Sequence, residues 1–120
     1  MSKYADVYLV PIPEENIPAY KKLATLAGKL FVKHGALKYR EYVASDLNVE
    51  DVVPFPKRIK LKPGETLIYA SVEFKSESHR NKVMKAIMAD PAMGAMMEGQ
   101  KPPFDYKRMV YGGFKVLVDL

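Results

Sequence analysis

Residues 66–74, which read TLIYASVEF, decide the fold of this 120-residue chain. Their β-branched and aromatic side chains predict a strand. Ser76 can cap a helix directly after it, and apolar residues then recur at helical spacing until Asp90-Pro91 ends that helix. Residues 92–97 predict a further helical turn, and residues 108–117 predict the next strand. This half of the chain therefore has the order strand, helix, strand.

The first half of the chain has the same order. Residues 4–12 predict a strand, Asn16 predicts a helix start, and the helix ends at Gly35, in the left-handed position that favours glycine. Residues 37–44 predict the second strand. Residues 46–64 predict a proline-rich connection with a short strand at 58–61.

Two β-α-β units in a row predict the α+β class. We expect a ferredoxin-like βαβ-βαβ fold, with a four-stranded antiparallel sheet and both helices on one face. Residues 1–120 suit a single domain of this kind.

Composition excludes several classes of protein. The chain has no Cys, so disulfides, thiolate metal sites and a Cys nucleophile are excluded. No apolar run approaches the ~20 residues needed to span a bilayer, and residues 1–6 lack a signal-peptide core. We expect a cytoplasmic protein that does not contact membranes. The net charge of +5 is spread along the chain. The chain has one basic cluster, which indicates a solvated loop rather than a nucleic-acid site. That cluster consists of Lys57, Arg58, Lys60 and Lys62.

Strand alternation divides the sheet into two faces. We assign to the helix side the apolar set Ala5, Val7, Leu9, Ile68, Ala70, Val72, Phe74, Val110, Phe114 and Val116. The other set is Tyr8, Val10, Tyr39, Glu41, Val43, Tyr69, Ser71, Glu73, Tyr111 and Leu117. A tyrosine-rich face of that kind predicts a twofold homodimer, sheet against sheet. The alternative is a monomer whose tyrosines face water.

Several strings resemble a known family. They are His34-Gly35-Ala36-Leu37, Leu61-Lys62-Pro63-Gly64-Glu65-Thr66, Lys75-Ser76 with His79-Arg80, Met88-Ala89-Asp90-Pro91, and Phe104-Asp105 with Lys107-Arg108-Met109 and Tyr111-Gly112-Gly113-Phe114. Together they resemble the YbaA-like family, domain of unknown function 1428. The resemblance implies the dimeric α/β-barrel superfamily, which includes antibiotic-biosynthesis monooxygenases, and it implies no established activity. The chain departs from the family pattern at Asn81, where an acid commonly follows His-Arg, and at Ala92.

Three residues are candidates for catalysis. His79 falls in the first turn of a helix, where backbone N–H groups favour a neutral imidazole that can act as a base. Arg108 can bind an anion, and Asp105 can hold Arg108 or His79. The alternatives are a His that hydrogen-bonds the helix entry and an ion pair that fixes a loop. His34, at a helix C-terminus, predicts a cap.

Four residues of the tyrosine-rich face are candidates for ligand binding: Tyr111, Tyr69, Tyr39 and Glu73. The alternative is that they fill a dimer interface. Methionines 84, 88, 93, 96 and 97 suit either core or the floor of an adaptable pocket. Gly112-Gly113 predicts a bulge or close backbone packing. We expect no metal or other cofactor, because the two His residues are far apart and no metal-ligand spacing occurs.

Two functions remain open. The first is a homodimer that binds a small molecule or catalyses a cofactor-independent reaction like that of the antibiotic-biosynthesis monooxygenases. The second is a non-catalytic dimer that acts through protein contacts, and a nucleic-acid-associated protein is less favoured.

Overall fold

The computed structural model describes residues 3–99 and 101–120, and its sheet has the expected topology. Strands β1 (Tyr4–Pro13) and β3 (Glu65–Phe74) lie in the centre. Strands β2 (Lys38–Val43) and β4 (Val110–Lys115) lie at the edges, giving the order β2-β3-β1-β4. All neighbours are antiparallel, which confirms the α+β, ferredoxin-like prediction.

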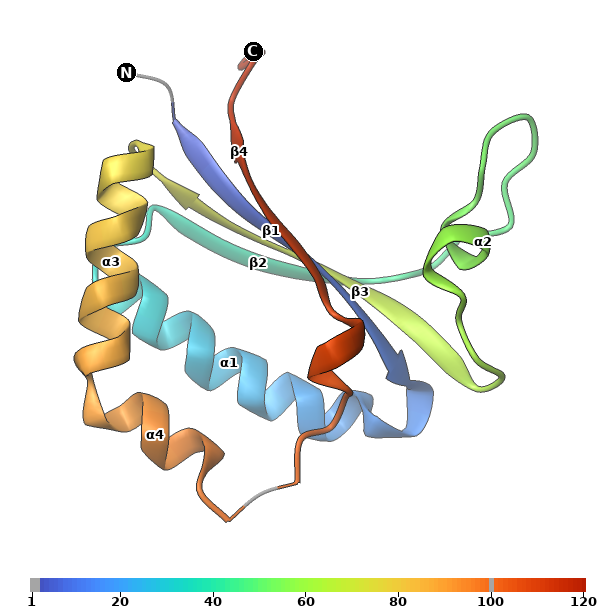
Figure 1. Cartoon of the computed structure of the whole chain (residues 1–120), viewed down its shortest axis with the longest axis horizontal. Coiled ribbons are helices and arrows are strands. Elements are labelled where there is room, and N and C mark those ends of the chain that lie inside the picture. The colour runs from blue at the N-terminus through green and yellow to red at the C-terminus, as the bar shows by residue number, and fades with distance from the viewer. Residues whose placement is uncertain (1–2, 100) are drawn as a thin grey trace.

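The longer helices cover one face of this sheet (Figure 1). They are α1 (Ile17–Lys33), α3 (Glu77–Ala89) and α4 (Pro91–Met97). Two 3-10 turns, η1 (Glu14–Asn16) and η2 (Tyr106–Arg108), precede α1 and β4. The short helix α2 (Phe55–Ile59) lies on the long β2–β3 connection, away from the other helices.

Several helix ends follow the sequence prediction. Gly35 has φ +110°, and the Ser76 hydroxyl accepts a 3.1 Å hydrogen bond from the His79 N–H. The His34 ring, at the C-terminus of α1, lies 2.8 Å from Asp90, which caps α4. Asn16 was predicted to cap α1 but makes no cap bond; its side-chain amide donates instead to the Pro103 carbonyl at 2.8 Å.

The strand predicted at residues 58–61 is wrong. Pro54 and Pro56 start a short helix, and Lys60 ends it in a left-handed conformation. The strand predicted from residue 108 begins two residues later, because η2 occupies residues 106–108. The bulge predicted at Gly112-Gly113 is absent, since β4 pairs with β1 without interruption from Val110 to Lys115. Gly113 instead leaves room for the Tyr4 ring, whose hydroxyl would overlap a β-carbon there.

The predicted faces of the sheet are correct for β3 and reversed for the other strands. Cross-strand partners share a face. Tyr8 pairs with Ala70 and Tyr111, so these three residues lie on one side of the sheet. That side is under the helices, where Tyr8 packs on the hydrophobic core. Tyr39 and Glu41 of β2 lie there too, opposite Val72 and Ala70.

The open face is consequently the more aliphatic one. It carries Val7, Leu9, Tyr42, Tyr69, Glu73, Val110 and Phe114. Alternation separated the two faces correctly within each strand, but it did not say how the faces of one strand match those of the next. The helices cover tyrosines and carboxylates, and this reversal determines where a polar site can form.

The core consists of two clusters of buried side chains. One is built on Phe74, Val72 and Phe31, with Val83 and Ile87 of α3. The other contains Val10, Ile12, Tyr20 and Ile68. Tyr8 packs against both clusters, so it marks the place where they meet.

Candidate functional site

A cavity of about 210 Å³ lies between the sheet and the helices. Its walls come from β1–β3, from α1, α3 and α4, and from the segment before β4. Most of its lining is apolar or aromatic: Tyr8, Val10, Tyr20, Leu23, Ala24, Ala27, Phe31, Tyr39, Ala70, Met84, Met93, Met96, Phe104, Tyr106 and Met109. The methionine cluster of the sequence thus partly lines a cavity, whereas Met88 is 70% exposed.

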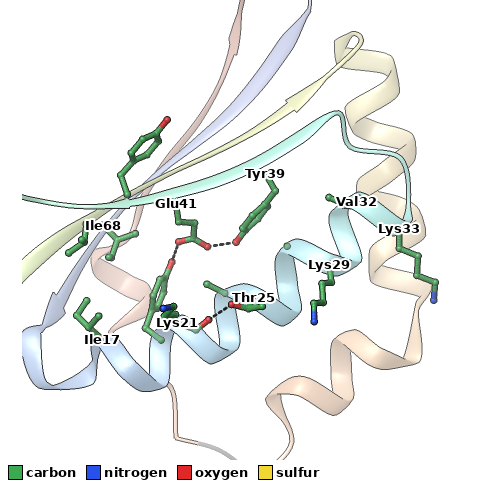
Figure 2. A pocket seen from close by; sticks show the side chains of 14 residues that line it. Ile17, Lys21, Thr25, Lys29, Val32, Lys33, Tyr39, Glu41 and Ile68 are labelled. Carbon is green, nitrogen blue, oxygen red and sulfur yellow. Dashed lines mark hydrogen bonds between the residues drawn. The ribbon is translucent and has the colours of Figure 1, made fainter.

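Glu41 is the carboxylate in this wall. It points from β2 toward α1, and the hydroxyls of Tyr20 and Tyr39 donate hydrogen bonds to its two oxygens (Figure 2). Burial, together with Glu41, raises the pKa of both tyrosines. Both hydroxyls therefore stay protonated at neutral pH and hold the carboxylate in one orientation.

A wider groove of about 900 Å³ runs between α1 and β2 on the outer side of this cluster (Figure 2). Tyr20, Ala24, Tyr39 and Glu41 line both the groove and the cavity. The Glu41 cluster is therefore the wall that the two spaces share. The helix approaches β2 closely here, because a β-carbon on Gly28 would lie 2.7 Å from the Tyr39 ring.

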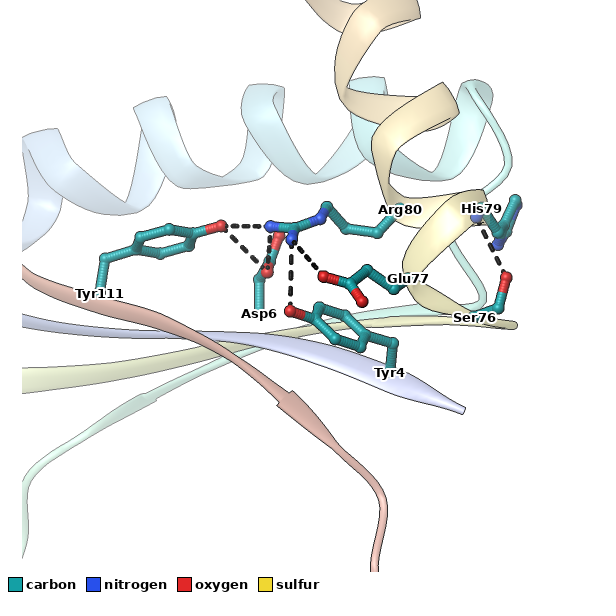
Figure 3. A network of polar contacts seen from close by, with 7 residues as sticks. All are labelled: Tyr4, Asp6, Ser76, Glu77, His79, Arg80 and Tyr111. Carbon is teal, nitrogen blue, oxygen red and sulfur yellow. Dashed lines mark hydrogen bonds and ion pairs between the residues drawn. The ribbon is translucent and has the colours of Figure 1, made fainter. Parts of the chain in front are cut away.

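A second polar cluster lies under α3 (Figure 3). Arg80 reaches across the sheet and donates to Asp6 at 3.0 Å, to the Tyr111 hydroxyl at 2.7 Å and to the Tyr4 hydroxyl at 3.2 Å. The Tyr111 hydroxyl also donates to Asp6 Oδ1 at 3.0 Å. The sequence lacks an acid next to Arg80, and the fold supplies one from β1.

Asp6 is fully buried. Burial raises its pKa more than the Tyr111 hydrogen bond and Arg80 lower it. Its Oδ2 and the Arg80 Nε have no hydrogen-bond partner within the described residues. The centroid of the Tyr111 ring lies 4.8 Å from that of the Tyr8 ring, with the two planes tilted by 35°, and Tyr8 connects this cluster to the cavity.

The three residues predicted for catalysis do not line the cavity, and His79 lies apart from the other two. Arg108 and Asp105 line a separate pocket, where the Arg108 N–H donates to the Asp105 carbonyl at 3.0 Å. His79 Nδ1 accepts the Lys75 N–H at 3.0 Å, just beyond the end of β3. Arg108 binds Glu65 at 2.5 Å, at the other end of that ten-residue strand. The Asp105 side chain accepts the Lys107 N–H at 3.0 Å. The ion-pair partner of Arg108 is Glu65, and the contact with Arg108 lowers the pKa of Glu65.

The four predicted ligand-binding residues divide between the two faces. Tyr39 lines the cavity, and Tyr111 belongs to the Arg80 cluster. Tyr69 and Glu73 lie on the open face, where Tyr69 contacts Tyr42. Sequence reasoning missed Tyr20, Asp6 and Arg80. Two of them carried a signal in the sequence: Asp6 is an acid within an apolar strand, and Tyr20 is a tyrosine within the apolar stripe of α1.

Other predicted features lie elsewhere in the fold. Lys57 and Arg58 form the last turn of α2, remote from the cavity. Over residues 3–99 and 101–120, His, Asp and Glu side chains form no group suited to a metal ion. No helix in those same ranges is long and apolar enough to cross a bilayer.

The sheet order, with the helices on one face and a cavity beneath them, defines a ferredoxin-like α+β protein. Solved structures share this fold over 96–100% of the chain. A nipsnap family protein of unknown function from Agrobacterium tumefaciens has TM-score 0.63 and 15% identity, with 88% of its chain covered. A dimeric ferredoxin-like protein from an uncultured marine organism has TM-score 0.57 and 12% identity, with 100% covered. SnoaB, a cofactor-independent oxygenase from Streptomyces nogalater, has TM-score 0.54 and 11% identity, with 98% covered.

The family is narrower than this fold class. Residues 3–106 match the family described as protein of unknown function DUF1428. The chain is also 35% identical over 117 residues to uncharacterized protein YbaA of Escherichia coli (strain K12), covering 98% of both chains. The chain therefore belongs to the DUF1428 family, which confirms the resemblance drawn from its motifs.

Proposed function

We propose that this protein is a homodimer that binds a small molecule in the cavity between the sheet and its helices. Glu41 is the polar anchor of that site. The observation that carries the proposal is a carboxylate fixed by two tyrosine hydroxyls in an otherwise apolar wall. Ligand pockets commonly combine apolar walls with a few oriented polar groups.

The chemistry of Glu41 supports a binding role. A carboxylate offers about four lone-pair sites to hydrogen-bond donors. Tyr20 and Tyr39 each occupy one, so acceptor capacity remains for a ligand. The methionines around the cavity can repack around an irregular shape. The groove that shares the Glu41 wall offers an approach from solvent.

The open face of the sheet supports the homodimer. Val7 and Leu9 lie beside Val110, which is 50% exposed, and Phe114, which is 57% exposed. A contiguous apolar surface of this kind favours a partner, and a second copy related by a twofold axis covers it on both chains. The described dimeric state of one ferredoxin-like neighbour is consistent with this arrangement.

A cofactor-independent reaction in the same cavity is the second candidate. The description of SnoaB suggests it, and one observation on this chain favours it. Asp6 is a buried carboxyl of raised pKa, joined to the cavity through Tyr111 and Tyr8. Such a group suits a role in proton transfer.

The proposal can be tested on protein carrying ¹³C-methyl methionine, by titrating neutral, cationic and anionic fragments. We expect at least one fragment class to shift the methyl signals of Met84, Met93 and Met96, which line the cavity. The signal of exposed Met88 should stay in place and is the internal control. If no fragment of any charge moves the methyl signal of any methionine that lines the cavity, the cavity is not a binding site.

A further inference from the structure

The size and charge of the cavity define the kind of ligand it takes. We propose that it binds a neutral single-ring molecule carrying a hydroxyl or amino group, which donates to Glu41, and that it rejects anions. This inference rests on the proposed function above and names its ligand class.

Size limits the ligand to about one ring. The cavity holds about 210 Å³. An apolar protein cavity of about 150 Å³ binds benzene, whereas sites for drug-sized ligands run from about 300 to 1,000 Å³. One ring with one or two small substituents therefore fits.

The lining favours an aromatic ring. Met84, Met93 and Met96 meet Phe31 and Phe104 around the cavity. Thioether sulfur makes favourable contacts with the edges of aromatic rings, and the phenylalanines add edge-to-face packing.

Charge sets the selectivity. Among the described residues that line the cavity, Glu41 is the sole charged one. Lys21, Lys29 and Lys33 line the outer groove instead. A ligand carboxylate would therefore be desolvated beside a like charge, with no lining cation to neutralise it. A neutral donor meets the opposite situation, because it fills a free acceptor site on an oriented carboxylate.

Tyr8 adds polarity without charge. Its side chain lines the cavity. Burial raises its pKa, with Asp6, Tyr111 and Glu41 adding to the rise. Tyr8 therefore stays a neutral hydroxyl and gives an anion no compensating charge.

The test uses phenol, anisole and benzoate as probes on the intact protein, with affinities read from the cavity methionine methyls. These share one ring and differ in donor and charge. We expect phenol to bind about tenfold more tightly than anisole, as a hydrogen bond to a charged group implies, and we expect benzoate not to bind.

Variants locate the effect. Glu41→Gln removes the charge and keeps the shape, so the preference for phenol over benzoate should fall at least several-fold. Glu50→Gln makes the same change at an exposed position and should bind like the wild type. The methionine methyl spectrum of each variant reports whether it is folded.

Each contrary result has its own meaning. If anisole binds as tightly as phenol, the ligand hydroxyl does not donate to Glu41 and that part of the proposal is wrong. If benzoate binds as tightly as phenol, the cavity does not reject anions. If fragments of another class move the cavity methyls and none of these three does, the ligand class is wrong while the binding site stands. The proposed function itself would be contradicted only if no fragment of any class shifted the methyl signals of the cavity methionines.

Discussion

At the scale of single residues, the carboxyl groups on the covered face need an explanation. Asp6 is fully buried, and one of its oxygens has no partner among the described residues. Burying a charge costs free energy that an ion pair offsets only when the remaining hydrogen bonds are made. Asp6 and Arg80 are thus poorly explained as a device for stability, which is consistent with a functional role for the cluster.

The raised pKa of Asp6 predicts an unusual pH dependence. Between its ordinary value of 3.8 and its raised value in the folded state, the folded protein holds more protons than the unfolded chain. The free energy of unfolding should therefore fall as pH rises through that interval, by at most about 1.4 kcal/mol per pH unit for one group.

Urea unfolding at a series of acidic to neutral pH values measures this in the wild type and in Asp6→Asn. Glu65 and Asp90, whose pKa values are lowered, give the opposite slope in both proteins and cancel in the difference. The stability difference, wild type minus variant, should decrease with rising pH. An increasing difference would contradict the pKa direction assigned to Asp6.

Residue type alone did not point to the Glu41 cluster. His79, Arg108 and Asp105 carry side chains that often catalyse, yet in the fold they cap a helix, bind Glu65 and fix a turn. Glu41 was placed on the face away from the helices, because its strand was assigned to the wrong side. Which face of a strand becomes covered depends on how the helices pack on the sheet. Alternation within a strand carries no information about that packing.

At the scale of elements, the close contact between α1 and β2 depends on Gly28, which has no side chain. In an open helix interior, Gly→Ala adds about 0.5–1 kcal/mol of stability. Gly94 of α4 has no atom within 4 Å of the new β-carbon, so Gly94→Ala should gain that amount. Gly28→Ala should instead lose about 1–3 kcal/mol, because its β-carbon overlaps the Tyr39 ring. Urea unfolding gives the free energy of unfolding of both variants. Equal gains would show that α1 can shift away from β2 without loss of stability.

The entry to α3 yields a second comparison. Ser76 caps the helix, so Ser76→Ala should cost about 1 kcal/mol in the free energy of unfolding. Ser78 lies exposed in the same turn, and Ser78→Ala should change stability by less than about 0.5 kcal/mol. Thermal or urea unfolding of both variants checks the difference. Equal losses would contradict the cap, because the higher helix propensity of Ala predicts no loss at either position.

The elements themselves were largely predictable. Strands β1 and β3 and helices α1 and α3 carry strong periodicity and clear end signals, and all were found within about two residues. Helix α2 was missed because its five residues are too few for a helical period to show. The 3-10 turn η2 was missed for the same reason, which displaced the predicted start of β4.

At the scale of the whole molecule, the proposed homodimer predicts a change of mass. The wild-type protein should sediment at twice its chain mass of 13.6 kDa. Phe114→Lys places a charge on the apolar part of the open face and should give a monomer. Leu26 of α1 is 48% exposed away from that face, so Leu26→Lys should remain dimeric. A wild-type particle of single-chain mass at micromolar concentration would contradict the dimer.

The position of β1 in the sheet has a consequence for how the molecule is assembled. Both of its partners, β3 and β4, are synthesised more than fifty residues later, so neither edge of β1 can be hydrogen-bonded while the early half of the chain is being made. Pairings so distant in sequence slow folding. The cavity, whose lining runs from Tyr8 to Met109, can close only once nearly the whole polypeptide is present. A nascent chain halted before Phe104 should therefore have neither a complete sheet nor a closed cavity.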